Sequence, residues 1–152
     1  MTTTRIKVGG NDARVKELRA LVERDPLNVN QRFMLAQALE SDGKINEAVK
    51  ELATCIEKGR RNLGVAHCNY AMALMKINKP EEALRHFDLA IETDPSNASF
   101  YLSNKASALT QIGLHDKARA IYAQILDRKD VSKETQRIVI KRVADMKSSG
   151  KK

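Results

Sequence analysis

Aromatic residues are scarce in this chain, which has three Tyr, three Phe and no Trp among 152 residues. Only three prolines and seven glycines are present, so a loop-rich fold is excluded. Two cysteines, Cys55 and Cys68, are too few for a disulfide framework and do not form a Cys-x-x-Cys pair. No apolar run approaches the roughly 18 residues of a membrane helix, and the first thirty residues hold none of signal-peptide length. We therefore expect a reduced, soluble, cytoplasmic protein.

Ala, Leu, Glu, Lys and Arg dominate what is present, and these residues favour helices. Hydrophobic residues make up 42% and charged residues 30%, which is typical of a globular domain and not of a disordered chain. The net charge of +8 raises the question of nucleic-acid binding. Most of this charge lies near the C-terminus, since residues 132–152 carry seven Lys or Arg and two acids. The middle of the chain is close to neutral.

Five sets of residues recur at a spacing of 35 positions, which indicates an internal repeat. Small residues, larger apolar residues and turn residues each keep the same phase. The sets are Ala36, Ala71 and Ala106; Leu39, Leu74 and Leu109; Gly43, Asn78 and Gly113; Ala48, Ala83 and Ala118; and Leu52, Phe87 and Tyr122.

Each repeat is predicted to contain two helices. The first helices are expected over 29–41, 64–77 and 99–112, and the second over 45–58, 80–93 and 115–128. Gly and Asn tolerate the left-handed conformation at the turns between them. The Ala positions mark where two helix backbones approach closely, and the larger residues fill the space between helices.

Helical segments are also predicted on both sides of the three repeats. Val15, Leu18, Leu21 and Val22 give residues 12–25 one apolar face. Ser132 is placed to cap a final helix whose Val139, Val143 and Met146 share a face, as in a solubilising end cap. We therefore predict one domain over 11–147, flanked by a disordered N-terminus over 1–10 and a disordered basic tail over 148–152. Its parts are a half repeat at 11–28, repeats at 29–63, 64–98 and 99–131, and a capping helix at 132–147.

The pattern resembles the tetratricopeptide repeat family over about residues 12–131. The residues that carry this resemblance are Tyr70-Ala71, Leu74, Ala83, Phe87 and Asp94-Pro95 in the middle repeat, Ala118 and Tyr122 in the third, and Leu35-Ala36, Leu39 and Ala48 in the first. The sequence departs from the family at its Trp position, held here by Arg32, His67 and Leu102. The period of this sequence is 35 residues, whereas that of the family is 34. A period of 35 residues is also the length of pentatricopeptide RNA-binding repeats. The Ala-x-x-x-aromatic spacing and the Asp-Pro endings favour the tetratricopeptide interpretation.

The resemblance implies an all-α, right-handed superhelix whose first helices line a concave groove for a partner peptide or helix. Phe33, Met72 and Phe100 are the expected anchors. Of the residues with which some family members grip a chaperone carboxylate, only Asn69 has a counterpart, so no such clamp is expected. The full set of inward positions is Asn30, Phe33, Gln37, Val65, Cys68, Asn69, Met72, Lys76, Phe100, Ser103, Asn104 and Ser107.

Nothing in the sequence assembles an active site, a metal site or a cofactor site. His67 and Cys68 are adjacent and point about 100° apart on a helix, so a structural role is expected for both. His86 and His115 lie among charged residues with no matched partner and are interpreted as surface or turn residues. Cys55 is expected in the core. The protein is therefore predicted not to be an enzyme.

Three functional hypotheses remain from the sequence. The first is a protein-binding scaffold or adaptor that uses the groove. The second is a nucleic-acid or anionic-surface binder, disfavoured because Lys76 is the sole charge among the inward positions. The third is a self-assembling scaffold. The basic patch for the second hypothesis comprises Arg60, Arg61, Lys133, Arg137, Lys141 and Arg142.

Overall fold

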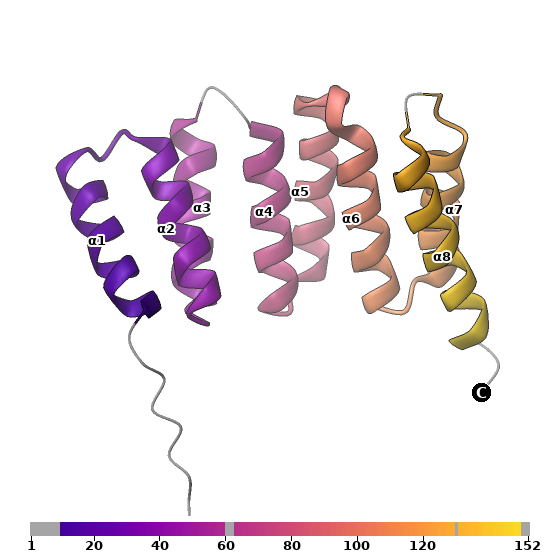
Figure 1. Ribbon diagram of the computed structural model, residues 1–152, viewed down its shortest axis with the longest axis horizontal. Helices are drawn as coiled ribbons and strands as arrows, with labels where there is room; N and C mark the ends of the chain where they lie inside the picture. The colour runs from indigo at the N-terminus through magenta and orange to yellow at the C-terminus, as the bar shows by residue number, and fades with distance from the viewer. Residues whose placement is uncertain (1–9, 60–62, 130, 150–152) are drawn as a thin grey trace, which may run out of the picture. The chain divides into compact units, whose positions relative to one another are not determined.

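The computed structural model describes residues 10–59, 63–129 and 131–149, and every regular element within them is a helix (Figure 1). The chain divides into two compact units, residues 1–61 and residues 62–152, and each is described by itself. The helices described are too short or too polar to cross a membrane. Disorder was predicted for residues 1–10 and 148–152. Of these, residues 1–9 and 150–152 lie outside the described residues. Gly10 and residues 148–149, which the same prediction included, are helical.

The first unit contains α1 (Gly10–Arg24), α2 (Val29–Ser41) and α3 (Ile45–Lys58). Helices α2 and α3 begin and end at the residues predicted for the first repeat. The side chain of Asn28 caps α2 by accepting a hydrogen bond from the Gln31 amide at 3.2 Å. Val15, Leu18 and Val22 of α1 are buried, which confirms the apolar face predicted for this segment.

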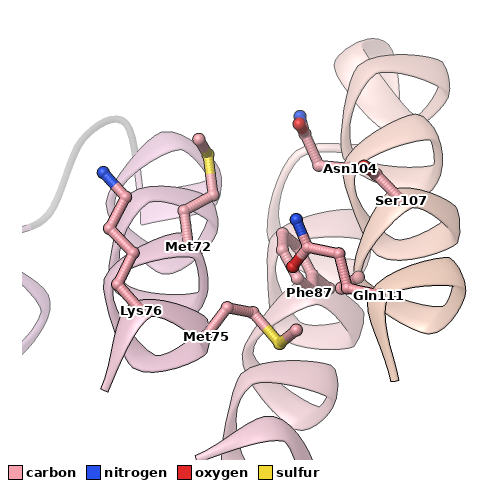
Figure 2. Close-up of a pocket in the computed structure, with 8 residues that line it drawn as sticks. Met72, Met75, Lys76, Phe87, Asn104, Ser107 and Gln111 are labelled. Carbon is pink, nitrogen blue, oxygen red and sulfur yellow. The ribbon is translucent and has the colours of Figure 1, made fainter. Parts of the chain in front are cut away.

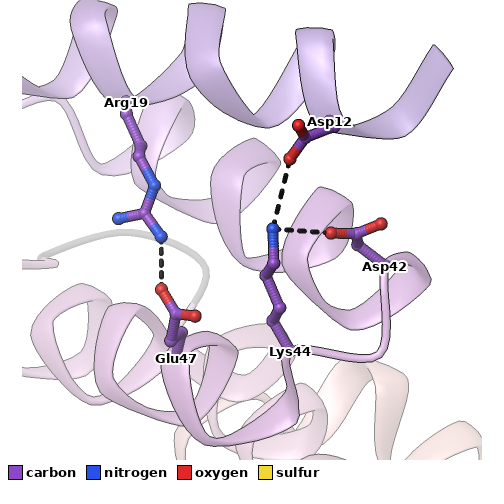
Figure 3. Close-up of polar contacts among 5 residues, drawn as sticks. All are labelled: Asp12, Arg19, Asp42, Lys44 and Glu47. Carbon is purple, nitrogen blue, oxygen red and sulfur yellow. Dashed lines mark hydrogen bonds and ion pairs between the residues drawn. The ribbon is translucent and has the colours of Figure 1, made fainter. Parts of the chain in front are cut away.

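Ion pairs link α1 to the turn and the first residues of α3 (Figure 3). The Nζ atom of Lys44 lies 2.8 Å from Asp42 Oδ2 and 3.3 Å from Asp12 Oδ1. Hydrogen bonds to Asp42 and then Asp12 raise the pKa of Lys44. Arg19, two turns after Asp12 in α1, pairs with Glu47 in the first turn of α3. Since all these groups except the half-buried Asp42 are substantially exposed, their contribution is mainly to orientation, and burial of the apolar face supplies the stability.

The described residues of the second unit, 63–129 and 131–149, form five α-helices. In Figure 1, α4, α6 and α8 form the layer nearer the viewer, and α5 and α7 lie behind them. The predicted boundaries of the second and third repeats agree with the observed helices to within two residues. The observed bounds are α4 (Leu63–Lys76), α5 (Pro80–Thr93), the short 3₁₀ helix η1 (Pro95–Asn97), α6 (Ala98–Gln111), α7 (His115–Leu126) and α8 (Lys133–Ser149).

The turn inside each hairpin has the same geometry in both units. Gly43, Asn78 and Gly113 have φ angles of 78°, 59° and 81°, as predicted for left-handed turn residues. The residue after each donates its backbone N–H to the carbonyl of the Leu at the repeated position, as in Lys44 to Leu39 at 2.8 Å. These bonds satisfy carbonyls that the helix end would otherwise leave unpaired.

The repeated apolar positions form the core. The two sets of Ala residues and the set of Leu residues, nine side chains that begin with Ala36, Ala48 and Leu39, are each at most 3% exposed. Leu52, Phe87 and Tyr122 are each at most 2% exposed. The small Ala side chains allow the two helices of a hairpin to approach, and the larger residues occupy the space beside them. The packing predicted from the 35-residue period is therefore confirmed.

A close approach between α4, α5 and α6 occurs at Gly64. A Cβ atom built on Gly64 would lie 2.5 Å from Asp94 Cβ and 3.0 Å from both Ala90 O and Tyr101 Oη. The Asp94 carboxylate accepts hydrogen bonds from Ser96, Asn97 and Tyr101, and these bonds lower its pKa to about 2. This corner fixes the end of α5 against the beginnings of α4 and α6.

Helix α8 closes the core of the second unit. Ser132 accepts a hydrogen bond from the Thr135 amide at 3.1 Å, which confirms the predicted cap. Val139 is fully buried, and Val143 and Met146 pack against the cluster that contains Leu109 and Tyr122. The predicted apolar face of this helix is therefore confirmed, and the helix continues to Ser149, two residues beyond its predicted end.

Candidate functional site

The predicted inward positions are divided between the two units. In the first unit, Asn30 and Gln37 of α2 are exposed and Phe33 is half-buried. In the second unit, the remaining positions lie on α4 and α6, two helices that contact each other. The second unit therefore holds most of the predicted site, and its geometry can be followed residue by residue.

A hollow of about 180 Å³ lies between α4 and α6, and we call it the α4–α6 groove (Figure 2). Met72 rises from α4 and Asn104 from α6 on its two sides, and Phe87 of α5 lies between them. The predicted residues Met72, Lys76, Asn104 and Ser107 all line it, together with Met75, Ala108 and Gln111, which the sequence reasoning missed. Gln111 follows Ser107 by one helical turn, a spacing that could have identified it.

Large apolar side chains are exposed along the same two helices. Phe100 is 59% exposed and Met72 is 37% exposed, as is Val65. The Phe100 ring makes an edge contact with Tyr101, with centroids 5.6 Å apart and an interplanar angle of 70°. Phe100 is thus supported from one side while most of its surface faces solvent, which is the state expected of a binding anchor.

Cys68 does not belong to the accessible site, so the prediction that it lines the groove is wrong. It is 1% exposed and lies beneath Asn104, whose Nδ2 atom is 3.8 Å from its Sγ atom. The same Nδ2 atom donates to the carbonyl of Phe100 at 3.0 Å, which fixes the amide over the sulfur. Burial raises the pKa of the Cys68 thiol to about 11, so this residue is a protonated core residue.

A second hollow adjoins the α4–α6 groove and brings α8 into the site. It shares Ser107 and Gln111 with the groove and is also lined by Arg142 and Asp145 of α8. Arg142 donates from Nη1 to Ser103 Oγ at 3.1 Å, and its Nη1 lies 3.5 Å from the Ser103 carbonyl oxygen. A residue predicted for the basic patch therefore contacts a residue predicted for the groove.

The basic patch is dispersed over the described part of α8. Lys133, Arg137, Lys141 and Arg142 are all exposed, but Arg137 lies 3.8 Å from Glu134 on its own helix, whereas Arg142 faces α6. Arg60 and Arg61 lie outside the described residues. The six cations are therefore not established as one surface.

His86 has a partner, which corrects the prediction that it is an unmatched surface residue. Its Nδ1 atom lies 2.9 Å from Nδ1 of His67, which is 8% exposed, and its ring also meets Tyr70 edge-on. One imidazole must donate and the other accept, so at least one Nδ1 is unprotonated. Burial is the main cause that lowers the pKa of both residues. His115 is exposed, as predicted.

The His67–His86 contact repeats a contact in the first unit. Arg32 and Glu51 occupy the positions 35 residues earlier, and their side chains pair at 2.8 Å. Both contacts join the first and second helices of one hairpin, so the two residues have a structural role at equivalent positions. Among the residues described, no group of three or more His, Cys, Asp and Glu side chains is placed to hold a metal ion.

These observations define a helical-repeat protein built from antiparallel α-hairpins with an exposed first-helix surface. Residues 64–97 match the model of the tetratricopeptide repeat family. The all-α helical solenoid class predicted from the sequence is confirmed. Folds of this family are typical of non-enzymatic protein-interaction scaffolds.

Several solved structures share this fold. MamA is 19% identical with a TM-score of 0.68, over 78% of this chain and 68% of that chain. MamA from residue 41 to its end, from Desulfovibrio magneticus RS-1, is 16% identical with a TM-score of 0.67, over 95% and 89%. YrrB, a TPR protein with an unusual peptide-binding site, is 17% identical with a TM-score of 0.63, over 78% of this chain and 60% of YrrB. No curated protein matches the chain. At these identities the likeness shows the fold.

Proposed function

We propose that this protein is a non-enzymatic scaffold that binds a peptide or helix of another protein in the α4–α6 groove. The observation that carries the proposal is the exposure of Phe100 and Met72 beside a hollow lined by amide and hydroxyl groups. Exposed apolar side chains supply contact area, and Asn104, Ser107 and Gln111 supply adaptable hydrogen bonds. The peptide-binding site of YrrB, a protein of the same fold, is consistent with this use.

The proposal treats the three hairpins at 29–63, 64–98 and 99–131 as repeats of one domain, between the half repeat and the capping helix. Phe33 and Gln37 are proposed as peptide-binding residues of α2 in the first unit. The cytoplasmic location stays a prediction.

The test uses the full chain as bait for a phage-displayed library of random peptides. We expect the wild type to enrich peptides whose binding is lost in Phe100→Ala/Met72→Ala. The matched control is Leu89→Ala, because Leu89 is an apolar side chain close to Met72 in size and exposure that lies on α5, a second helix, where it is 38% exposed. Retention of the peptides by the double variant, or no enrichment by the wild type, would contradict the groove proposal. Salt-sensitive DNA binding that is lost in Lys133→Gln/Lys141→Gln would instead move the function to α8.

A further inference from the structure

The surface of first helices in the second unit continues from α4 and α6 onto α8. Ile138 and Arg142 follow Ser103 and Ser107 by 35 residues, the repeat period that relates the two preceding first helices. Ile138 is 43% exposed, and Arg142 lines the hollow that adjoins the α4–α6 groove. Helix α8 therefore presents, at two inward positions of the repeat, an apolar side chain and a cation.

Arg142 is held in place by neutral groups. Its Nη1 atom contacts the hydroxyl and the carbonyl oxygen of Ser103, so these bonds orient the guanidinium without neutralising its charge. The planar guanidinium carries five N–H donors, and those beyond Nη1 suit the two oxygens of a carboxylate. Asp145 lines the same hollow but is itself engaged in a polar interaction. Lys76, which lines the α4–α6 groove, is engaged in one as well.

Large apolar side chains are exposed on both of the helices that the Arg142–Ser103 contact joins. Phe100 on α6 precedes Ser103 by one helical turn, and Ile138 on α8 precedes Arg142 by one helical turn. A segment that crosses from α6 to α8 passes over two helices that expose an aromatic ring, an oriented guanidinium and an aliphatic side chain. Such a surface is complementary to a segment that combines an acidic residue with apolar residues.

We propose that the partner segment is an acidic, apolar peptide and that Arg142 of α8 pairs with one of its carboxylates. This inference rests on the proposed function, because it names the chemistry of the partner in the groove. It also assigns to α8 a binding role in addition to closing the core. An anchored charge-assisted pair of this kind changes affinity by about tenfold when one partner is removed.

The test compares Arg142→Gln with Arg137→Gln in the full chain, using the peptides enriched from the random library. Arg137 is the matched control because it lies on the same helix, is 79% exposed and faces Glu134. We expect the enriched peptides to carry Asp or Glu beside apolar residues. Arg142→Gln should weaken their binding about tenfold, and Arg137→Gln should change it by less than about twofold.

A charge exchange gives the second measurement. Arg142→Glu should abolish binding of the acidic peptide, and replacing the peptide's acid by Lys should restore it with this variant alone. Peptides that need Phe100 but lack acids, or that bind Arg142→Gln as well as they bind the wild type, would overturn the inference while leaving the groove proposal intact. Failure of the wild type to enrich any peptide would refute the groove proposal, and the inference with it. Helical circular dichroism and thermal unfolding of each variant verify that α8 remains folded.

Discussion

Gly64→Ala gives the sharpest test of the packing, because local and tertiary effects have opposite signs. Gly64 lies in the first turn of α4, and replacing Gly by Ala within a helix normally stabilises it by up to about 1 kcal/mol. The added Cβ would, however, lie 2.5 Å from Asp94 Cβ and 3.0 Å from the carbonyl oxygen of Ala90. Neither atom is the free end of a flexible side chain, so the beginning of α4 must move away from the end of α5.

Overpacking of this kind typically costs about 1–3 kcal/mol, which exceeds the gain in helix propensity. We expect Gly64→Ala to lower the free energy of unfolding by about 1–2 kcal/mol. The measurement is urea unfolding followed by circular dichroism at 222 nm, a wavelength that reports α-helix, with the midpoint compared at equal slope.

Gly113→Asn is the control for this experiment. Gly113 follows the end of α6 with a φ of 81°, and a Cβ atom there would meet nothing within 4 Å. Asn already occupies the equivalent turn position at residue 78 with a φ of 59°, so this replacement should be nearly neutral. A Gly64→Ala variant as stable as the wild type, or more stable, would refute the reasoning about the α4–α5–α6 corner.

Two further predictions concern titratable groups of the second unit. The folded state lowers the pKa of His67 and His86 below the ordinary histidine pKa of about 6.5. As the pH falls through this ordinary value, the unfolded state binds more protons than the folded state does. The free energy of unfolding should therefore fall as the pH drops from 7.5 to 5. Urea midpoints across this range should show a weaker pH dependence in His86→Gln and an unchanged one in the exposed-site control His115→Gln; equal slopes in all three proteins would count against the pair. Because burial raises the pKa of Cys68 to about 11, iodoacetamide should modify it at pH 7.5 only after unfolding, as followed by mass spectrometry with and without urea, and rapid labelling of the native protein would contradict its burial.

Much of the fold was predictable because residues of the same type recur at equivalent positions of the three repeats, so each repeat supports the assignment made in the others. The Ala set beginning at Ala36 and the turn set beginning at Gly43 place helices, turns and core residues together, and all of these predictions are confirmed. Helix ends were less certain by one or two residues, since the sequence period fixes the phase of a helix better than its last turn.

The site was less predictable, because exposure depends on which neighbouring side chains cover a position. Cys68 shares the phase of Phe33 and Ser103, but its short side chain is covered by Asn104. The His67–His86 contact joins residues 19 positions apart on two helices. The preceding repeat indicates this contact, because Arg32 and Glu51 have opposite charges at the same two positions and form an ion pair.

The 35-residue period also indicates that residues of α8 belong to the same surface as the inward positions of α6. Ile138 and Arg142 lie one period after Ser103 and Ser107, so extending the inward positions by 35 residues would have included them. Composition instead indicated a solubilising cap, because basic residues dominate this helix. Repeat phase is thus a better guide to which surface a side chain joins than the net charge of its helix.

The order of contacts along the chain has a consequence for how the protein forms. Within each unit, the extensive contacts join helices that are adjacent or next but one in sequence. Closing these short loops has a small entropic cost, so folding should be fast and should be able to start at any hairpin. During synthesis, each hairpin can fold soon after it leaves the ribosome, before the helix that will cover it exists. Amide hydrogen exchange should accordingly be slowest in α5 and α6, which have neighbours on both sides, and faster in α8, which closes the end of its unit.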